Sequence, residues 1–183
     1  MSPRRHPDGF SLAELAVSLA VLGLLLAGAF SILHGALRAY GWGAARLEAQ
    51  RSARVALERM VKELREAGYD PTGAGIAPIT LAAPDRLTFQ RDLNGNGVID
   101  ATRERVTFVL RPGESVLRRD AGAGAQPIIE EVRGLRLTYF DVTGAPTTDA
   151  SRVAAVRMRI EVGVGGPTSI METEVTLRNY RGP

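Results

Sequence analysis

Between positions 92 and 100 the chain places oxygen-bearing side chains at alternate positions. Asp92, Asn94 and Asn96 follow this spacing, a glycine comes next, and Asp100 closes the run. Carboxylate, amide and backbone carbonyl oxygens are the ligands that calcium takes in proteins, and the carbonyl of Val98 would add one more. The spacing therefore predicts a calcium-binding loop, and calcium is the only cofactor that the sequence indicates.

The match to an EF-hand calcium loop is incomplete. The position of the closing bidentate glutamate holds Arg103, and Glu104 follows one residue late. Strands, rather than helices, are expected on both sides of the loop. A bound calcium would therefore need a looser geometry, completed by Glu104 or by the Val98 carbonyl. The alternative is a plain hairpin connection, rich in Asn-Gly pairs that tolerate positive φ.

The sequence offers little from which to build a catalytic centre. It has no cysteine and only two histidines, His6 and His34, which excludes thiol chemistry and leaves no pair of histidines near another reactive group. Walker, dinucleotide-binding and G-x-S-x-G motifs are absent. The net charge of +3 is too small to predict a nucleic-acid-binding face. We therefore expect neither an enzyme nor a nucleic-acid-binding protein.

The most informative segment is an uncharged, apolar run at residues 15–33. A helix needs about 20 apolar residues to cross a bilayer, and a helix in a soluble core would need a polar face that this run lacks. Arg4 and Arg5 precede the run, and short basic segments stay in the cytoplasm. The sequence therefore predicts a single membrane-spanning helix whose N-terminus is cytoplasmic.

Glu14 stands at the very start of this apolar run. A carboxylate at the edge of the hydrocarbon is costly unless it is paired, so it is a candidate functional residue. The alternative is a carboxylate that reaches the water without a partner. The segment also differs from an ordinary secretory signal, because the apolar run continues directly into a helical pattern instead of reaching a small-x-small cleavage site.

Gly9, Phe10 and Glu14, followed by the apolar segment, resemble the N-terminus of type IV prepilins, a family that includes pilus subunits and type II secretion pseudopilins. The resemblance implies that a prepilin peptidase cuts between Gly9 and Phe10, so that residues 1–9 are a leader. It also implies N-methylation of Phe10. By the same resemblance, Glu14 pairs with the Phe10 amino group of a neighbouring subunit, which would compensate its charge.

From residue 38 to 68 the pattern changes to that of an amphipathic helix. Apolar residues recur at three- and four-residue spacing, at Ala49, Ala53, Leu57, Met60, Leu64 and Ala67. Gly68 and Pro71 are typical of a helix end. We expect one long helix with a transmembrane half at 10–37 and an amphipathic half at 38–68.

The rest of the chain, residues 69–183, is predicted to form a β-rich head. Alternating or β-rich segments separated by turn residues lie at 86–90, 104–110, 115–119, 135–141, 153–162 and 170–177. Glycine-rich stretches at 121–125 and 163–166 are expected to be loops. A long helix packed on an antiparallel sheet gives an α+β fold, which the resemblance also implies.

Two segments of the head, 132–141 and 175–179, are similar to W-type minor pilins and J-type minor pseudopilins, which are low-copy subunits near a filament tip. The resemblance implies a structural subunit that starts in the bacterial inner membrane and ends in a periplasmic or cell-surface filament. Its partners would be prepilin peptidase, other pilin or pseudopilin subunits and the inner-membrane assembly platform. A membrane-tethered binding module and an unprocessed single-pass membrane protein remain as alternatives.

Overall fold

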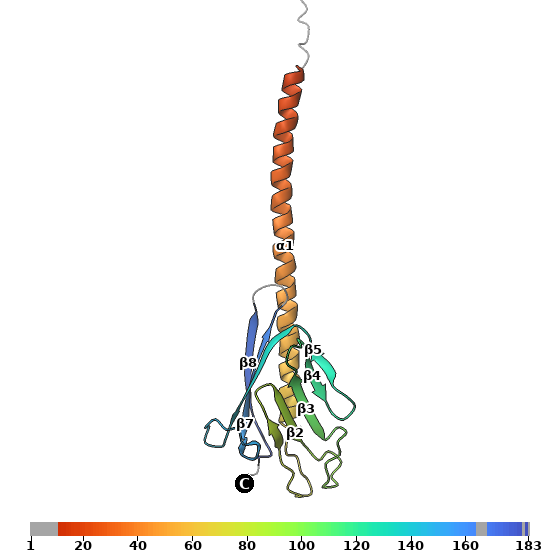
Figure 1. Ribbon diagram of the computed structural model, residues 1–183, viewed down its shortest axis with the longest axis vertical. Helices are drawn as coiled ribbons and strands as arrows, with labels where there is room; N and C mark the ends of the chain where they lie inside the picture. The colour runs from red at the N-terminus through yellow and green to blue at the C-terminus, as the bar shows by residue number, and fades with distance from the viewer. Residues whose placement is uncertain (1–10, 164–167, 181, 183) are drawn as a thin grey trace, which may run out of the picture. The chain divides into compact units, whose positions relative to one another are not determined.

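The computed structural model describes residues 11–163, 168–180 and 182. The chain consists of two compact units, Met1–Ala44 and Ala45–Pro183. A single helix, α1 (Leu12–Leu64), belongs to both units, and all strands of the described residues lie in the second (Figure 1). The predicted long N-terminal helix is therefore confirmed.

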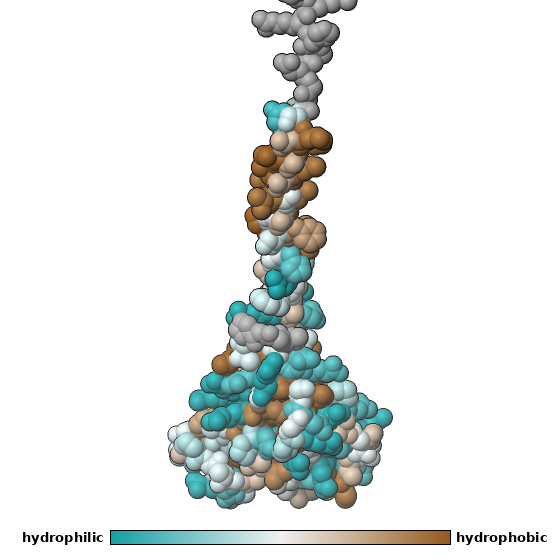
Figure 2. Space-filling view, turned by 45° about the horizontal axis from the view of Figure 1, so that its top comes forward, coloured by the Kyte–Doolittle hydropathy of each residue, from teal (hydrophilic) through white to brown (hydrophobic). Residues whose placement is uncertain are grey.

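Within the first unit, the face of α1 seen in Figure 2 carries a broad apolar band. The large exposed side chains between residues 15 and 33 are Leu15, Val17, Leu19, Val21, Leu22, Leu24, Leu25, Leu26, Phe30, Ile32 and Leu33. Among the described residues, α1 is the one helix whose length and composition suit a membrane span. A helix without a polar face is stable where lipid replaces water, as the sequence predicts for this segment.

The second unit contains two antiparallel sheets, and in each sheet strands that follow one another in the chain are neighbours. The larger sheet has the order β1-β2-β3-β4-β5, formed by β1 (Ile79–Ala82), β2 (Arg86–Gln90), β3 (Arg105–Leu110), β4 (Leu117–Asp120) and β5 (Gln126–Ile129). The smaller sheet has the order β6-β7-β8, formed by β6 (Val132–Phe140), β7 (Ala155–Val162) and β8 (Ser169–Thr176). A short 3-10 helix, η1 (Ala150–Arg152), precedes β7.

The predicted α+β class is confirmed, with two corrections. The expected sheet is divided into two, and β1 and β5 were not predicted. Both of these strands have four residues and form the edges of the larger sheet, so each pairs on one side only. Pro127 is a second reason why the sequence did not predict β5, because proline disfavours a strand in general. It is tolerated here because β5 is an edge strand. Of the predicted loop at 163–166, residues 164–166 lie outside the described residues.

One face of α1 joins the two sheets into a single hydrophobic core (Figure 1). Ala53, Leu57, Met60 and Leu64 are buried, which confirms the predicted amphipathic stripe, and Ala56 is buried beside them. The sheets contribute Leu87, Phe89, Val106, Phe108, Leu117, Ile129, Val132, Leu137, Tyr139, Val156, Met158, Ile160, Val162 and Val175. The sheets thus cover the helix face that a period of 3.6 residues predicts.

Gly68 determines where the helical segment ends. The α-helix itself stops at Leu64, four residues before the predicted end, and residues 65–68 form tighter turns, in which the Ala67 N–H donates to the Leu64 carbonyl at 3.1 Å. Gly68 has φ +73°, and a Cβ there would lie 2.7 Å from Cγ of Pro78. The Gly68 N–H then donates to the carbonyl of Gln90 at 2.8 Å. Glycine therefore allows the chain to turn into the sheet at this point.

Tyr139 connects the two sheets by a buried hydrogen bond. Its hydroxyl donates to the backbone carbonyl of Ala83 at 2.7 Å, just before β2, while its ring belongs to β6. Burial raises the pKa of the Tyr139 phenol, only partly offset by the hydrogen bond to Ala83. The phenol therefore stays protonated as a donor, and it holds the smaller sheet against the β1–β2 connection.

Candidate functional site

The start of α1 is stabilised by a reciprocal pair of side chains, Ser11 and Glu14. Oγ of Ser11 accepts from the backbone N–H groups of Ala13 and Glu14 at 3.1 and 3.5 Å. In return, Oε2 of Glu14 accepts from the Ser11 N–H at 3.0 Å. This arrangement is a capping box, which satisfies N–H groups that the first helical turn leaves without partners. The S-x-x-E sequence carries the signal for it, and the reasoning from sequence missed it.

The capping box restricts where the Glu14 carboxylate can lie. It holds the charge within one turn of the helix start, where the helix dipole favours an anion. Gly9 and Phe10, the predicted cleavage and methylation residues, lie outside the described residues. Glu14 therefore occupies the predicted position at the edge of the apolar segment, and within a single chain its carboxylate has a local backbone partner.

The predicted calcium loop connects β2 to β3 and is organised around the buried side chain of Asp92. Its Oδ1 accepts from the N–H groups of Gly95 and Asn96 at 2.7 and 3.2 Å, and its Oδ2 accepts from Gly97 at 2.8 Å. Oδ1 of Asn94 accepts from the Asn96 N–H at 2.9 Å. The oxygens of Asp92 and Asn94 thus accept hydrogen bonds from the loop's own backbone, and of these two side chains only Asp92 is buried.

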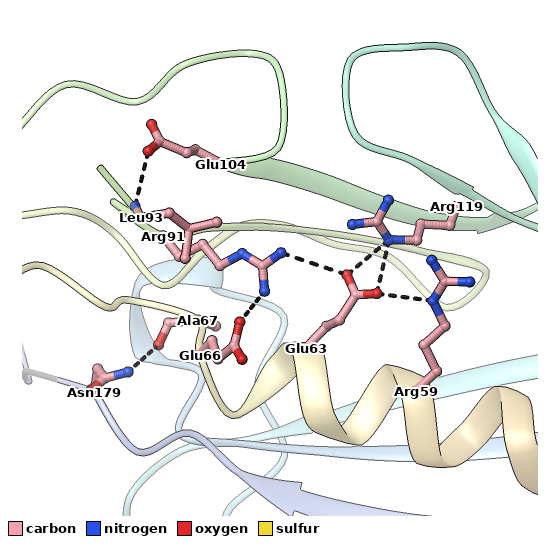
Figure 3. A network of polar contacts seen from close by, with 9 residues as sticks. All are labelled: Arg59, Glu63, Glu66, Ala67, Arg91, Leu93, Glu104, Arg119 and Asn179. Carbon is pink, nitrogen blue, oxygen red and sulfur yellow. Dashed lines mark hydrogen bonds and ion pairs between the residues drawn. The ribbon is translucent and has the colours of Figure 1, made fainter. Parts of the chain in front are cut away.

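Glu104 closes the loop from the start of β3. Its Oε1 accepts from the N–H groups of Leu93 and Asn94 at 2.9 and 3.1 Å, the first of which Figure 3 shows, and its Oε2 accepts from Asp100 at 2.9 Å. The side chains of Asn94 and Asp100 are joined at 3.2 Å. The structure therefore brings Asp92, Asn94, Asp100 and Glu104 into one loop, in which the oxygens of Asp92, Asn94 and Glu104 accept backbone N–H groups and that of Asp100 accepts the Asn94 side-chain amide.

Asn96 and Val98 complete the predicted ligand set. Oδ1 of Asn96 accepts from the Val98 N–H at 2.8 Å, and the Val98 side chain is 63% exposed. Within residues 11–163, 168–180 and 182, no three histidine, aspartate or glutamate side chains are grouped closely enough to hold a metal ion. The loop geometry also fits a plain hairpin connection between β2 and β3, so calcium binding remains a prediction.

The loop after α1 supports the β2–β3 connection. The Asp70 carboxylate accepts from the N–H groups of Ala74 and Gly75 at 3.0 and 2.9 Å. Burial alone would raise the pKa of Asp70, but these amides, that of Ile76 and the Thr72 hydroxyl lower it to about 2. A Cβ on Gly97 would lie 3.1 Å from the Thr72 hydroxyl, so the two loops are in close contact.

A network of charged residues attaches α1 to the larger sheet (Figure 3). Nε of Arg119, on β4, lies 2.9 and 2.8 Å from the two carboxylate oxygens of Glu63, and Nε of Arg59 lies 3.1 Å from Oε1. The guanidinium of Arg91 pairs with Glu66 and lies 4.0 Å from Glu63. Sequence reasoning did not find this network, because the sheet residues are far from Glu63 in the chain.

The Arg91 side chain is only 8% exposed, and its guanidinium carbon lies 5.8 Å from the centre of the Phe89 ring. Within the described part of the chain, its Nε has no hydrogen-bond partner. A buried guanidinium is costly without carboxylates beside it. Glu63 and Glu66 therefore compensate the charge of Arg91 where α1 meets the larger sheet.

Comparison with known proteins identifies the N-terminal segment. Residues 4–30 match the family model of the prokaryotic N-terminal methylation motif. This motif is the type IV prepilin and pseudopilin signal, and the matched residues include Gly9, Phe10 and Glu14. The predicted resemblance to prepilins is thereby confirmed. No curated protein matches the chain.

The match is limited to the N-terminal segment, and it identifies the kind of signal that this segment carries. The motif is that of a type IV pilin or pseudopilin that prepilin peptidase processes and that assembles with other subunits. Proteins of this class are structural rather than enzymatic. The motif and the long apolar helix fit anchoring in the inner membrane. The minor-subunit type, the membrane topology and the lack of enzymatic activity remain predictions for this chain.

We expect Glu63→Ala to destabilise the protein by about 2–3 kcal/mol, because Arg91 and Arg119 would lose a largely buried carboxylate. Arg59→Ala is the matched control, since Arg59 is half exposed and its pair with Glu63 is worth less than about 1 kcal/mol. Thermal unfolding of the full chain in detergent, followed by near-ultraviolet circular dichroism, measures both. Equal effects of the two substitutions would show that the network does not attach the helix.

Proposed function

We propose that the protein is a structural subunit, a minor pilin or minor pseudopilin, of a type IV pilus or a type II secretion pseudopilus. The observation that carries the proposal is the methylation motif at residues 4–30, which leads into an apolar helix with a carboxylate in its first turn. The subunit is held in the inner membrane with residues 1–9 in the cytoplasm and the β-rich head in the periplasm. From there it enters the filament with the help of the assembly platform.

Processing converts the membrane protein into a filament subunit. Prepilin peptidase hydrolyses the bond between Gly9 and Phe10, which leaves a carboxylate on Gly9 and a free amino group on Phe10. In N-methylation the nitrogen of that amino group then takes a methyl group from an electrophilic methyl donor, which departs with the electrons of the broken bond, and the nitrogen loses a proton. Cleavage removes Arg4 and Arg5 but keeps the apolar half of α1, so the mature chain can leave the bilayer sideways and pack against other apolar helices.

Glu14 has two roles in this proposal. In the single chain its carboxylate caps α1 through the Ser11 N–H. In the filament it pairs with the Phe10 amino group of a neighbouring subunit, which offsets the cost of a charge among apolar side chains. A neutral glutamine retains a carbonyl oxygen for the cap but loses the ion pair, so substitution can separate the two roles.

The minor-subunit assignment is supported by the segments at 132–141 and 175–179. They correspond to β6 and to the end of β8 with the residues that follow. In the structure these segments belong to the smaller sheet, whose inner residues Leu137, Tyr139 and Val175 are buried. A position near the filament tip would give this subunit a role in starting assembly, with few copies in each filament.

We also propose that calcium stabilises the β2–β3 connection through Asp92, Asn94, Asn96, the Val98 carbonyl, Asp100 and Glu104. Each oxygen has two lone pairs. Oδ2 of Asp92 and Oε2 of Glu104 each accept one backbone N–H in the loop and so retain a free lone pair. Calcium would therefore find a free lone pair on each of these two oxygens, and binding would draw the other ligands toward them.

The first prediction from the proposed function concerns processing. In cells that contain prepilin peptidase, mass spectrometry of the mature chain is expected to show an N-terminus that begins with a methylated Phe10. Gly9→Ala tests the cleavage site, because added bulk next to the scissile bond hinders approach of the peptidase, whereas Gly23→Ala lies in the open surface of the apolar segment. An intact Met1 in the wild-type chain would refute the pilin proposal in favour of an unprocessed membrane protein.

The second prediction concerns Glu14. Glu14→Gln should be processed normally and keep the helix cap, but its amount in sheared filaments should fall at least about tenfold because the ion pair is lost. Ser11→Ala is the matched control, since it removes the other half of the capping box and leaves the carboxylate. If Ser11→Ala reduces incorporation as strongly as Glu14→Gln, or if Glu14→Gln reaches wild-type amounts, Glu14 acts through the cap and not through an ion pair.

The third prediction concerns calcium. At about a hundred times its dissociation constant, calcium should raise the free energy of unfolding of the full chain by about 2.7 kcal/mol, and a chelator should reverse the change. Asp100→Asn should weaken this effect, because it removes a charged ligand and keeps the backbone N–H that Glu104 accepts. Asp149→Asn, outside the loop, is the control. No shift of the thermal midpoint with calcium would leave the loop as a plain β2–β3 connection.

A further inference from the structure

The outer face of α1 carries a ridge of basic residues around one exposed aliphatic side chain. Val55 is 65% exposed, and Arg51 and Lys62 lie on the same stripe of the helix, four residues before and seven residues after it. Arg54 lies beside this stripe, and Glu58 is its one acidic member. Both of them and Lys62 also border a groove of about 690 Å³ on the side of β8, whereas Val55 and Arg51 do not line it. We call these five residues the basic ridge. Among the described residues, none of its basic members forms an ion pair, so their charge is available to a partner.

An apolar groove with an acidic rim runs between α1 and the edge strand β5. Its volume is about 560 Å³, and its apolar surface includes Ala45, Ala49 and Ile128. Its rim carries Glu48, Glu130 and Glu131, and no basic residue lines it. We call this the acidic groove. Within the described part of the chain, none of its three glutamates forms an ion pair, so it has the opposite charge to the basic ridge.

The rim of the groove includes a residue in an unfavourable backbone conformation. Glu131 has φ +59°, in the left-handed region that favours glycine or asparagine. The side chain at this position therefore has no advantage for the local backbone. A glutamate there still adds charge to the rim, which is the property that a basic partner requires.

We propose that the basic ridge of one copy of this chain docks into the acidic groove of a second copy. Val55 lies on the apolar surface of the groove, and Arg51 and Arg54 face the glutamates of its rim. The match is both of shape and of charge, because a convex aliphatic side chain flanked by bases meets an apolar hollow flanked by acids. The inference rests on the filament role in the proposed function, which packs the α1 helices of neighbouring subunits together, and it requires that at least two copies of this chain are neighbours.

The arrangement of the two copies follows from the membrane. Chains anchored in one bilayer by their N-terminal helices point in the same direction, so an antiparallel pair is excluded. The ridge is centred about eight residues after the part of α1 that lines the groove, which is an axial offset of about 12 Å. The contact is therefore staggered and heterologous: in a pair, one copy keeps a free groove and the other keeps a free ridge, so a further copy can add at either end.

Cysteine cross-linking of the full, processed chain in membranes tests the contact, because the natural chain has no cysteine. Val55→Cys and Ile128→Cys are made separately and then co-expressed. Mild oxidation is expected to give a cross-linked dimer from the mixture and none from either variant alone. A chain that carries both substitutions should give a ladder of trimers and larger products. Products that stop at the dimer would overturn the staggered arrangement.

Charge reversal provides the second arm of the test. Arg54→Glu should lower the yield of the cross-link at least about fivefold, and Glu130→Arg in the copy that supplies the groove should restore it. Arg136→Glu is the matched control, since Arg136 is exposed on β6, away from both surfaces. Glu131→Asn should lower the yield while the thermal midpoint of the chain stays level or rises, because asparagine tolerates the backbone conformation.

The outcomes separate this inference from the proposed function. If the wild-type chain, with Val55 and Glu131 unchanged, is absent from sheared filaments, the proposed function fails. If the chain is present in filaments but Val55→Cys cross-links only to a different protein, or not at all, the second-copy contact is wrong and the filament role stands. Dimers from Val55→Cys alone would indicate a symmetric contact along the ridge and would also overturn the proposal.

Discussion

The burial of one face of α1 against both sheets is the interaction on which the rest of the head depends. Ala53 and Ala56 are small enough for the strands to approach the helix closely, and Leu57, Met60 and Leu64 fill the space on either side. Burying each of the larger three contributes about 1.5–3 kcal/mol before the cost of ordering the chain is counted. Without this face, the smaller and larger sheets would have no common core.

The same packing decides which charges of α1 are engaged and which are free. Glu63 and Glu66 lie where the helix meets the larger sheet, so they accept the guanidinium groups that the strands and their connections bring there. Other charged residues of the helix, such as Arg51 and Lys62, remain exposed. Packing on one face of a helix therefore leaves charged side chains exposed elsewhere on it, and in the proposed filament these are the ones that neighbouring subunits can reach.

Glu14 shows how one side chain can serve a monomer and an assembly in different ways. Its carboxylate belongs to a capping box within the single chain, and the helix start benefits from its charge. In the proposed filament the same charge lies among apolar helices, where an amino group is a stronger partner than an amide N–H. The residue is thus compatible with a stable helix before assembly and with a specific contact after it.

Local patterns in the sequence were enough to predict the apolar segment, the position of Glu14, the buried stripe of α1 and most of the strands, because hydrophobic periodicity and turn residues act over a few positions. Ser11 and Glu14 were equally readable as a capping box. The edge strands β1 and β5 were not, since four residues paired on one side carry little pattern of their own. The Glu63 network and the acidic groove required the tertiary structure. Glu63 and Arg119 are 56 residues apart, and only the packing of α1 on the sheets brings such side chains within reach of each other.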